Sequence, residues 1–294
     1  MTLPFDEAEL DELEWSAEPG PVEEADPGQL FRFAGEYEVI QPDERARVTA
    51  VRQVPYRWVC SLDIMRDGEL YRGSGVLIGP RQVLTAAHNI YNRKGERPDS
   101  VHVVPARNGS DRPFGRFRAE GFQTSSEFLT HPVPGSRRDI TLITLDTDAA
   151  AANSLGHWGS PTTGQGTGLA VLDAGFLAGR DVVVCGYPGD KCGGAACDPA
   201  RGWTAESQAD TMWSHFGPAR FLKQMPGFLL HTADTHKGQS GSPVWIRFTS
   251  GRRTLVGIHV SSTAVPNATG TGVVTVNRAV HLDTDTVALI RSWM

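Results

Sequence analysis

The sequence has few cysteines, no long apolar run and no excess of basic residues, and each absence excludes a class of protein. Four cysteines in 294 residues are too few for a disulfide-stabilised scaffold. No stretch of about 18 apolar residues is present, which argues against a membrane-spanning helix. The formal net charge is −6, and residues 1–27 hold ten acidic side chains and no basic one, so the rest of the chain is near neutral. A near-neutral body lacks the basic surface that nucleic-acid binding needs.

The N-terminal segment also lacks the basic and apolar regions of a secretory signal. We therefore expect a cytoplasmic protein if Met1 is the native start, and a secreted one if a signal peptide has been removed. Residues 1–38 are predicted to form an acidic arm. This arm is interpreted either as an inert tail or as a pro-segment.

The four cysteines are Cys60, Cys185, Cys192 and Cys197. Cys192 and Cys197 are close enough in sequence to close a small loop, or they stay reduced in a cytosol. A zinc site formed by the last three cysteines and a histidine would need a compact set of four ligands. We expect no metal and no cofactor to be required.

Glycine and proline are abundant, with 32 and 19 residues, and short apolar runs recur between turn signals. This texture predicts an all-β barrel or sandwich instead of long helices. Asp67-Gly68 predicts a hairpin turn. Residues 148–168 have the composition of a connection between two barrels, and residues 283–293 allow one amphipathic helix.

The most informative stretch is residues 237–243 (KGQSGSP), which places Ser240 between glycines in a predicted tight turn. A serine hydroxyl needs a base to accept its proton and a carboxylate to orient that base. His88 in TAAH and Asp139 in RDITL supply these two groups upstream. The order His, Asp, Ser differs from that of α/β-hydrolases and of subtilisin-like enzymes.

These three motifs resemble those of the chymotrypsin-like serine proteases. The resemblance is closer to the bacterial glutamyl endopeptidases, through residues 186–191 (GYPGDK), 211–213 (TMW), 234–235 (DT) and 257–259 (GIH). It implies two six-stranded antiparallel β-barrels followed by a C-terminal helix. The expected divisions are residues 1–38 for the arm, 39–150 for the first barrel with His88 and Asp139, 151–180 for the connection, 181–280 for the second barrel with Ser240, and 281–294 for the helix.

The resemblance also implies the roles of individual residues. His88, Asp139 and Ser240 would form a catalytic triad, and the backbone amides of Gly238 and Ser240 would form the oxyanion hole. The implied pocket for the substrate side chain involves Thr235, His259, Asp234 and Ser262, and would select Glu before Asp. The expected partners are a protein or peptide substrate and an activating protease, and we expect a monomer.

Several alternatives remain open at this point. Asp234 at the base of the pocket would instead select Lys or Arg, as in trypsin-like relatives. The same triad also suits an esterase, or a catalytically silent binding module that keeps the fold. Asp146 and Asp148 are rivals for the carboxylate, although both follow the apolar strand instead of preceding it. The histidines His102, His131 and His157 are interpreted as surface or loop residues, and Trp213 and Trp245 as packing residues.

The chain departs from the family pattern at three places. Asn89 stands where many members have a cysteine after the catalytic histidine. Residues 192–208 have the character of an insertion between two family motifs. The resemblance places the start of the mature chain near Val39, so cleavage after Glu38 by a Glu-specific protease is predicted to release the active enzyme.

Overall fold

The computed structural model of the chain describes residues 39–40, 42–159, 169–191, 210–267 and 271–294. The acidic arm up to Glu38, the Cys192–Cys197 loop and the 192–208 insertion lie outside these residues. The predictions made for those segments therefore stay predictions.

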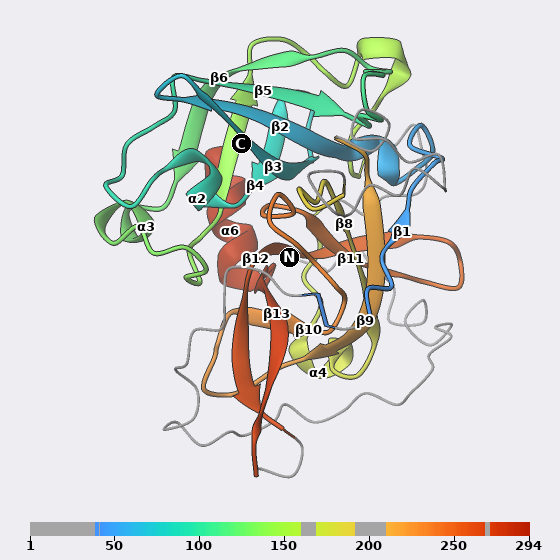
Figure 1. Cartoon of the computed structure of the whole chain (residues 1–294), viewed down its shortest axis with the longest axis vertical. Coiled ribbons are helices and arrows are strands. Elements are labelled where there is room, and N and C mark those ends of the chain that lie inside the picture. The colour runs from blue at the N-terminus through green and yellow to red at the C-terminus, as the bar shows by residue number, and fades with distance from the viewer. Residues whose placement is uncertain (1–38, 41, 160–168, 192–209, 268–270) are drawn as a thin grey trace.

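The first barrel fills the upper half of the molecule (Figure 1). Its six strands form a closed antiparallel ring in the order β2 (Val59–Arg66), β3 (Glu69–Leu77), β4 (Gln82–Thr85), β7 (Thr141–Leu145), β6 (Phe117–Thr124) and β5 (Ser100–Pro105). The predicted hairpin joins β2 to β3, with Arg66 opposite Glu69. Asp67 and Gly68 both have positive φ angles, 53° and 78°, which a two-residue turn of this kind requires.

The second barrel lies below the first. Its strands follow the order β9 (Trp213–Arg220), β10 (Phe228–His231), β13 (Val273–His281), β12 (Arg253–Pro266), β11 (Pro243–Arg247) and β8 (Asp181–Gly186). Pairing of β8 with β9 closes this ring. The short strand β1 (Ala46–Arg47) pairs with β9, so it lies on the second barrel although the sequence grouped residues 39–150 with the first.

Within the described residues, helical structure is confined to short segments and one terminal helix. The short ones are η2 (Tyr56–Trp58), α2 (Ala87–Ile90), α3 (Ser126–Thr130), η3 (Ala152–Ser154) and α4 (Ala174–Leu177). The terminal helix α6 spans Thr284–Trp293, and its N-cap Asp283 accepts a hydrogen bond from the Thr286 amide. Two six-stranded barrels and a C-terminal helix confirm the predicted fold. No helix in the part of the chain described here is long and apolar enough to cross a membrane.

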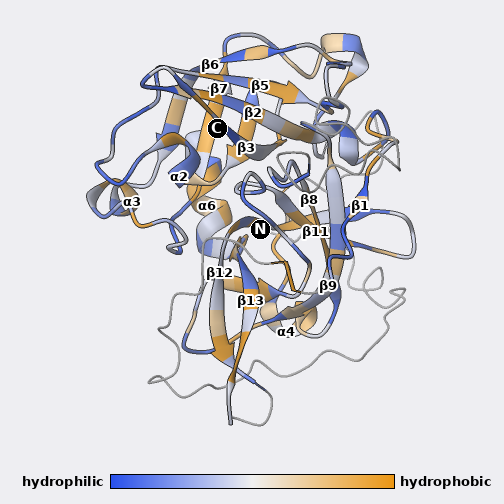
Figure 2. Ribbon diagram, viewed as in Figure 1, coloured by the Kyte–Doolittle hydropathy of each residue, from blue (hydrophilic) through white to orange (hydrophobic). Residues whose placement is uncertain are grey.

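The largest apolar cluster joins the two barrels. Trp58 at the end of η2, Trp158 of the connection and Trp245 of β11 pack ring to ring, with centroids 5.6 and 5.7 Å apart. Val287 and Ile290 of α6 pack into the same cluster. Hydrophobic residues concentrate on the strands and α6, while the connecting loops are mainly hydrophilic (Figure 2). Shared burial of this kind holds the barrels in a fixed relation.

Candidate active site

A continuous hydrogen-bonded chain of three side chains spans the junction of the barrels. His88 Nε2 lies 2.6 Å from Ser240 Oγ, and His88 Nδ1 lies 2.6 Å from Asp139 Oδ2. The backbone amide of His88 donates to Asp139 Oδ1 at 2.9 Å. Asp139 has no exposed surface and Ser240 is 2% exposed. With Asp139 ionised, this arrangement fixes the tautomer in which Nδ1 carries the proton and Nε2 accepts from the serine.

Each of these three residues lies close to the start or the end of a barrel strand. His88 lies in α2, directly after β4, and Asp139 precedes β7. Ser240 lies in the turn before β11, in which Gly238 and Gly241 have φ angles of 98° and 84°. A side chain at Gly238 would collide with the Tyr187 carbonyl oxygen at 2.5 Å. Only glycine tolerates both the conformation and the close approach, which explains the glycines of the motif.

The turn that carries Ser240 is held from the first barrel. The Ser74 amide donates to the Ser240 carbonyl at 2.8 Å, and Ser74 Oγ donates to the Gly238 carbonyl at 2.8 Å. Asn89 Nδ2 also donates to the Ser240 carbonyl at 2.9 Å. Sequence reasoning noted Asn89 only as a missing cysteine and did not single out Ser74. No local motif marks either residue, because both contacts join positions far apart in the chain.

Beside Ser240, the predicted pocket residues Thr235 and His259 are fully buried, and Ser262 is 2% exposed. Thr235 Oγ1 has no hydrogen-bond partner among the described residues. His259 packs against His231 of β10, with ring centroids 5.5 Å apart. Burial, with the neighbouring His231, His88 and Arg278, holds the pKa of His259 well below its usual value. Burial likewise lowers the pKa of His231 to about 3, so both rings are neutral at neutral pH.

The structure turns Asp234 toward the start of the described chain. Its carboxylate accepts the amides of Ile40 and Glu44, at 2.7 and 3.0 Å, and Asp234 is 1% exposed. Its own amide donates to His215 Nδ1 at 2.8 Å. The carboxylate is therefore engaged by backbone N–H groups and is closed off from solvent.

Arg45 anchors the segment that wraps around Asp234. Its side chain has no exposed surface and pairs with Asp43 at 2.8 Å and with Asp190. Lys191 also pairs with Asp43, at 2.7 Å. Burial raises the pKa of Asp43, but hydrogen bonds from Arg45 and Lys191 outweigh it and bring the pKa well below its usual value.

The rival residues do not join the hydrogen-bonded chain. Asp146 and Asp148 are exposed, and Asp148 accepts the Ala151 amide in a local turn. His131 is exposed, while His102 and His157 are partly buried elsewhere in the first barrel and the connection. Trp245 and Trp213 are buried, at 2% and 4% exposure, as expected of packing residues. Within the described residues, no three His, Cys, Asp or Glu side chains gather in a metal-binding group.

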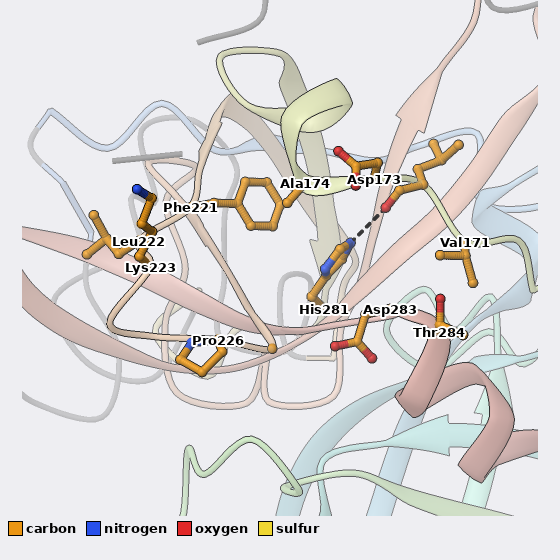
Figure 3. Close-up of a pocket in the computed structure, with 12 residues that line it drawn as sticks. Val171, Asp173, Ala174, Phe221, Leu222, Lys223, Pro226, His281, Asp283 and Thr284 are labelled. Carbon is orange, nitrogen blue, oxygen red and sulfur yellow. Dashed lines mark hydrogen bonds between the residues drawn. The ribbon is translucent and has the colours of Figure 1, made fainter. Parts of the chain in front are cut away.

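A cavity of about 340 Å³ lies on the second barrel (Figure 3), and Ser240 is not among the residues that line it. Apolar side chains of the β9–β10 connection and of the segment before α4 line it, including Phe221, Leu222 and Val171. Its polar groups serve the fold: Asp283 caps α6, Asp173 caps α4, and His281 Nε2 bonds to the Leu172 carbonyl at 3.1 Å. None of the predicted site residues lines this cavity.

Two six-stranded barrels with a Ser–His–Asp chain at their junction define the architecture of a trypsin-like peptidase. The sequence profile of the trypsin-like peptidase domain matches residues 73–258, and the chain belongs to that family.

Similar proteins support this family assignment. The chain is 29% identical over 70% of its length to a "Glutamyl endopeptidase" of Bacillus licheniformis and 26% identical over 75% to one of Staphylococcus epidermidis. It is also 27% identical over 76% of its length to a Bacillus subtilis protein named "Extracellular metalloprotease". The matched region covers 54%, 65% and 62% of these three proteins, respectively.

Solved structures share the fold. A Glu endopeptidase in complex with MPD superposes with a TM-score of 0.63 at 23% identity, covering 87% of this chain and 98% of that one. The protease Anisep from Arthrobacter nicotinovorans gives a TM-score of 0.57 at 16% identity, with 82% and 94% covered.

Proposed function

We propose that the protein is a serine endopeptidase that hydrolyses peptide bonds through an acyl-enzyme. The observation that carries this proposal is the Asp139–His88–Ser240 chain, with both side-chain contacts at 2.6 Å. His88 takes the proton of Ser240 as Oγ attacks the carbonyl carbon, and then gives it to the leaving amine. The amides of Gly238 and Ser240 stabilise the oxyanion. Water, deprotonated by His88, then attacks the acyl-enzyme, and the carboxylic acid product leaves as Ser240 regains its proton.

We propose further that the enzyme cleaves after Glu in preference to Asp. Thr235 Oγ1 is a buried hydroxyl without a partner among the described residues, and such a group gains most from a strong acceptor. Neutral His259 can donate one N–H and Ser262 a hydroxyl in the proposed pocket. A substrate carboxylate would accept hydrogen bonds from these groups. Two relatives bear the name glutamyl endopeptidase, which favours the same assignment.

The position of Asp234 weighs against cleavage after Lys or Arg. A carboxylate that selects a cation must present its oxygens to the substrate. Both oxygens of Asp234 accept backbone amides, from Ile40 and Glu44. Such a carboxylate is satisfied without a substrate cation.

Profiling of a peptide library, together with labelling by a fluorophosphonate, tests the proposal. We expect cleavage after Glu, and labelling of wild-type protein only at Ser240. Ser240→Ala and His88→Ala should each lower kcat by about 10⁶-fold, because the residues act as a unit. Labelling without peptide cleavage would identify an esterase, and the absence of both would identify a binding module. Cleavage after Lys or Arg would refute the acidic preference.

We also propose that the protein is made as a zymogen and matures by cleavage after Glu38. The support is the position of the chain at Ile40, whose amide lies 2.7 Å from the buried Asp234 next to Thr235. An amino group freed at Val39 would begin one residue from this contact. Because an α-amino group is partly protonated near neutral pH, it would favour an anionic substrate side chain.

A further inference from the structure

Arg278 of β13 is a buried cation that none of the steps above uses. It is 9% exposed, its Nε donates to Ser261 Oγ at 2.9 Å, and its guanidinium lies 4.9 Å from the centroid of the Phe228 ring. Among the residues that the structure describes, it makes no ion pair within 4.0 Å. Burial lowers its pKa to about 10, against the opposing effect of Asp139, so it remains charged at neutral pH. An enclosed cation without a close counter-ion is costly and calls for an explanation.

Gly135 connects Arg278 with Asp139. Gly135 has a φ angle of 76°, and a Cβ there would overlap Arg278 Nη2 and lie 2.5 Å from Ser261 Oγ. The backbone of Gly135 therefore rests on the Arg278–Ser261 pair. The Gly135 amide in turn donates to Asp139 Oδ2 at 2.5 Å. The same oxygen accepts from His88 Nδ1.

We propose that Arg278 is a positioning residue for the Asp139–His88 pair, acting through the backbone of Gly135 and through its fixed positive charge. This assignment rests on the proposed function. Contact with Gly135 places the amide that holds Asp139 Oδ2, and the charge offsets that of a carboxylate with no access to water.

Among the described residues, four titratable groups interact electrostatically with Arg278 or with its neighbour His259, each from a different element. Asp139 precedes β7, His88 lies in α2, His259 in β12 and His231 in β10. His259 and His231 are neutral at neutral pH, because burial lowers the pKa of both. Arg278 is thus the permanent positive charge among these groups, and it opposes protonation of His88.

Replacement of Arg278 separates positioning from simple packing. Arg278→Met keeps the length of the side chain and removes its charge. We expect kcat for a Glu peptide to fall by about 10²-fold with KM nearly unchanged, because small misplacement of a catalytic group is that costly. The acid limb of the pH profile of kcat/KM should move to higher pH by about one unit, since loss of a nearby positive charge favours the imidazolium form of His88. Arg278→Lys should leave the limb in place and recover most of kcat.

Arg180→Met is the matched control. Arg180 is also buried, at 8% exposure, and its guanidinium lies 4.3 Å from the centroid of the Phe176 ring. It follows α4, and its Nη1 donates to the Phe176 carbonyl of that helix. It should lower stability without moving the acid limb. An acid limb that stays in place in Arg278→Met, whatever happens to kcat, would overturn the assignment. So would an unchanged kcat with a raised KM, which would mean that Arg278 binds the substrate.

A second measurement tests the inference independently of hydrolysis. In the Ser240→Ala background, NMR titration of His88 should give a higher midpoint when Arg278→Met is added. A raised midpoint in a protein whose wild type cleaves no peptide would support the role of Arg278 and refute the proposed function. An unchanged midpoint would overturn the role of Arg278 alone.

Discussion

At the scale of the residue, the surroundings of a carboxylate decide what it does. Asp139 and Asp234 are both buried and both accept backbone amides. Both also lie beside an imidazole, but the His88 ring at Asp139 reaches on to Ser240 Oγ, whereas Asp234, 3.2 Å from His215 Nδ1, receives the amides of Ile40 and Glu44. The first is thus suited to the proposed chemistry and the second to holding the chain.

The change Asp234→Asn tests this division of roles. It removes the charge and one acceptor oxygen, so the free energy of unfolding should fall by about 2 kcal/mol, the usual loss for a hydrogen bond to a charged group. The preference for Glu over Lys in peptide cleavage should stay as in wild type. Urea unfolding and library profiling provide the two readouts, with Asp173→Asn, in the cap of α4, as control. If the wild type instead cleaved after Lys or Arg and Asp234→Asn lost that cleavage, Asp234 would contact the substrate and this division of roles would be wrong.

Sequence reasoning reached the residues that lie in compact motifs. His88, Asp139 and Ser240 were predicted from residue types with a known mutual chemistry, and the structure brings them together, although their catalytic role stays a prediction. Ser74 and Arg278 were missed. Each acts through backbone groups of a distant loop, and such contacts leave no local signature in the sequence.

At the scale of the element, residues 42–48, which include β1, lie against the second barrel and are called the strap here. Arg45 connects it to the loop at Asp190, and the Val48 amide donates to the Met212 carbonyl at 2.8 Å. The barrel strands were predictable from their alternating apolar runs. The strap was not, because its polar sequence resembles a surface loop and its order comes from ion pairs with a remote loop.

Arg45→Met should loosen the strap and make the protein less sensitive to acid. Asp43 and Asp190 would each lose one partner, while Lys191 would still pair with Asp43. We expect a loss of about 2 kcal/mol in the free energy of unfolding at pH 7. The pKa of Asp43 is lower in the folded protein than the 3.8 of the unfolded chain. The ionised carboxylate therefore stabilises the fold fully above pH 3.8, and this stabilisation is lost as the pH falls toward the pKa of the folded state. The difference between wild type and variant, measured by urea unfolding, should therefore shrink in acid. A constant difference between pH 7 and pH 3 would contradict this account.

At the scale of the whole molecule, the two barrels, their junction and α6 agree with what the sequence predicted. The exception is β1, which lies on the second barrel. Nearby, the Ile40 amide contacts Asp234, the neighbour of the proposed pocket residue Thr235. The fate of residues 1–38 therefore bears on the proposed pocket.

N-terminal sequencing of the active species tests maturation. We expect it to begin at Val39, and Glu38→Gln should slow maturation of the full chain. The same enzyme produced from Val39 should be active from the start. Full activity of an intact, uncut chain would contradict the zymogen proposal.

The hydrogen bonds from Ser74 to the Ser240 turn determine how the protein loses activity as it unfolds. Ser240, the proposed nucleophile, belongs to one barrel, while Ser74, which holds its turn, belongs to the other. A slight separation of the barrels would therefore displace Ser240 while both sheets stay intact. In rising urea, hydrolysis should vanish before the far-ultraviolet circular dichroism of the strands changes. The loss of turnover would then report separation of the two barrels before the strands unfold. A compound that stabilises the contact between the barrels would be detected because it protects activity in urea, even if it never entered the proposed pocket.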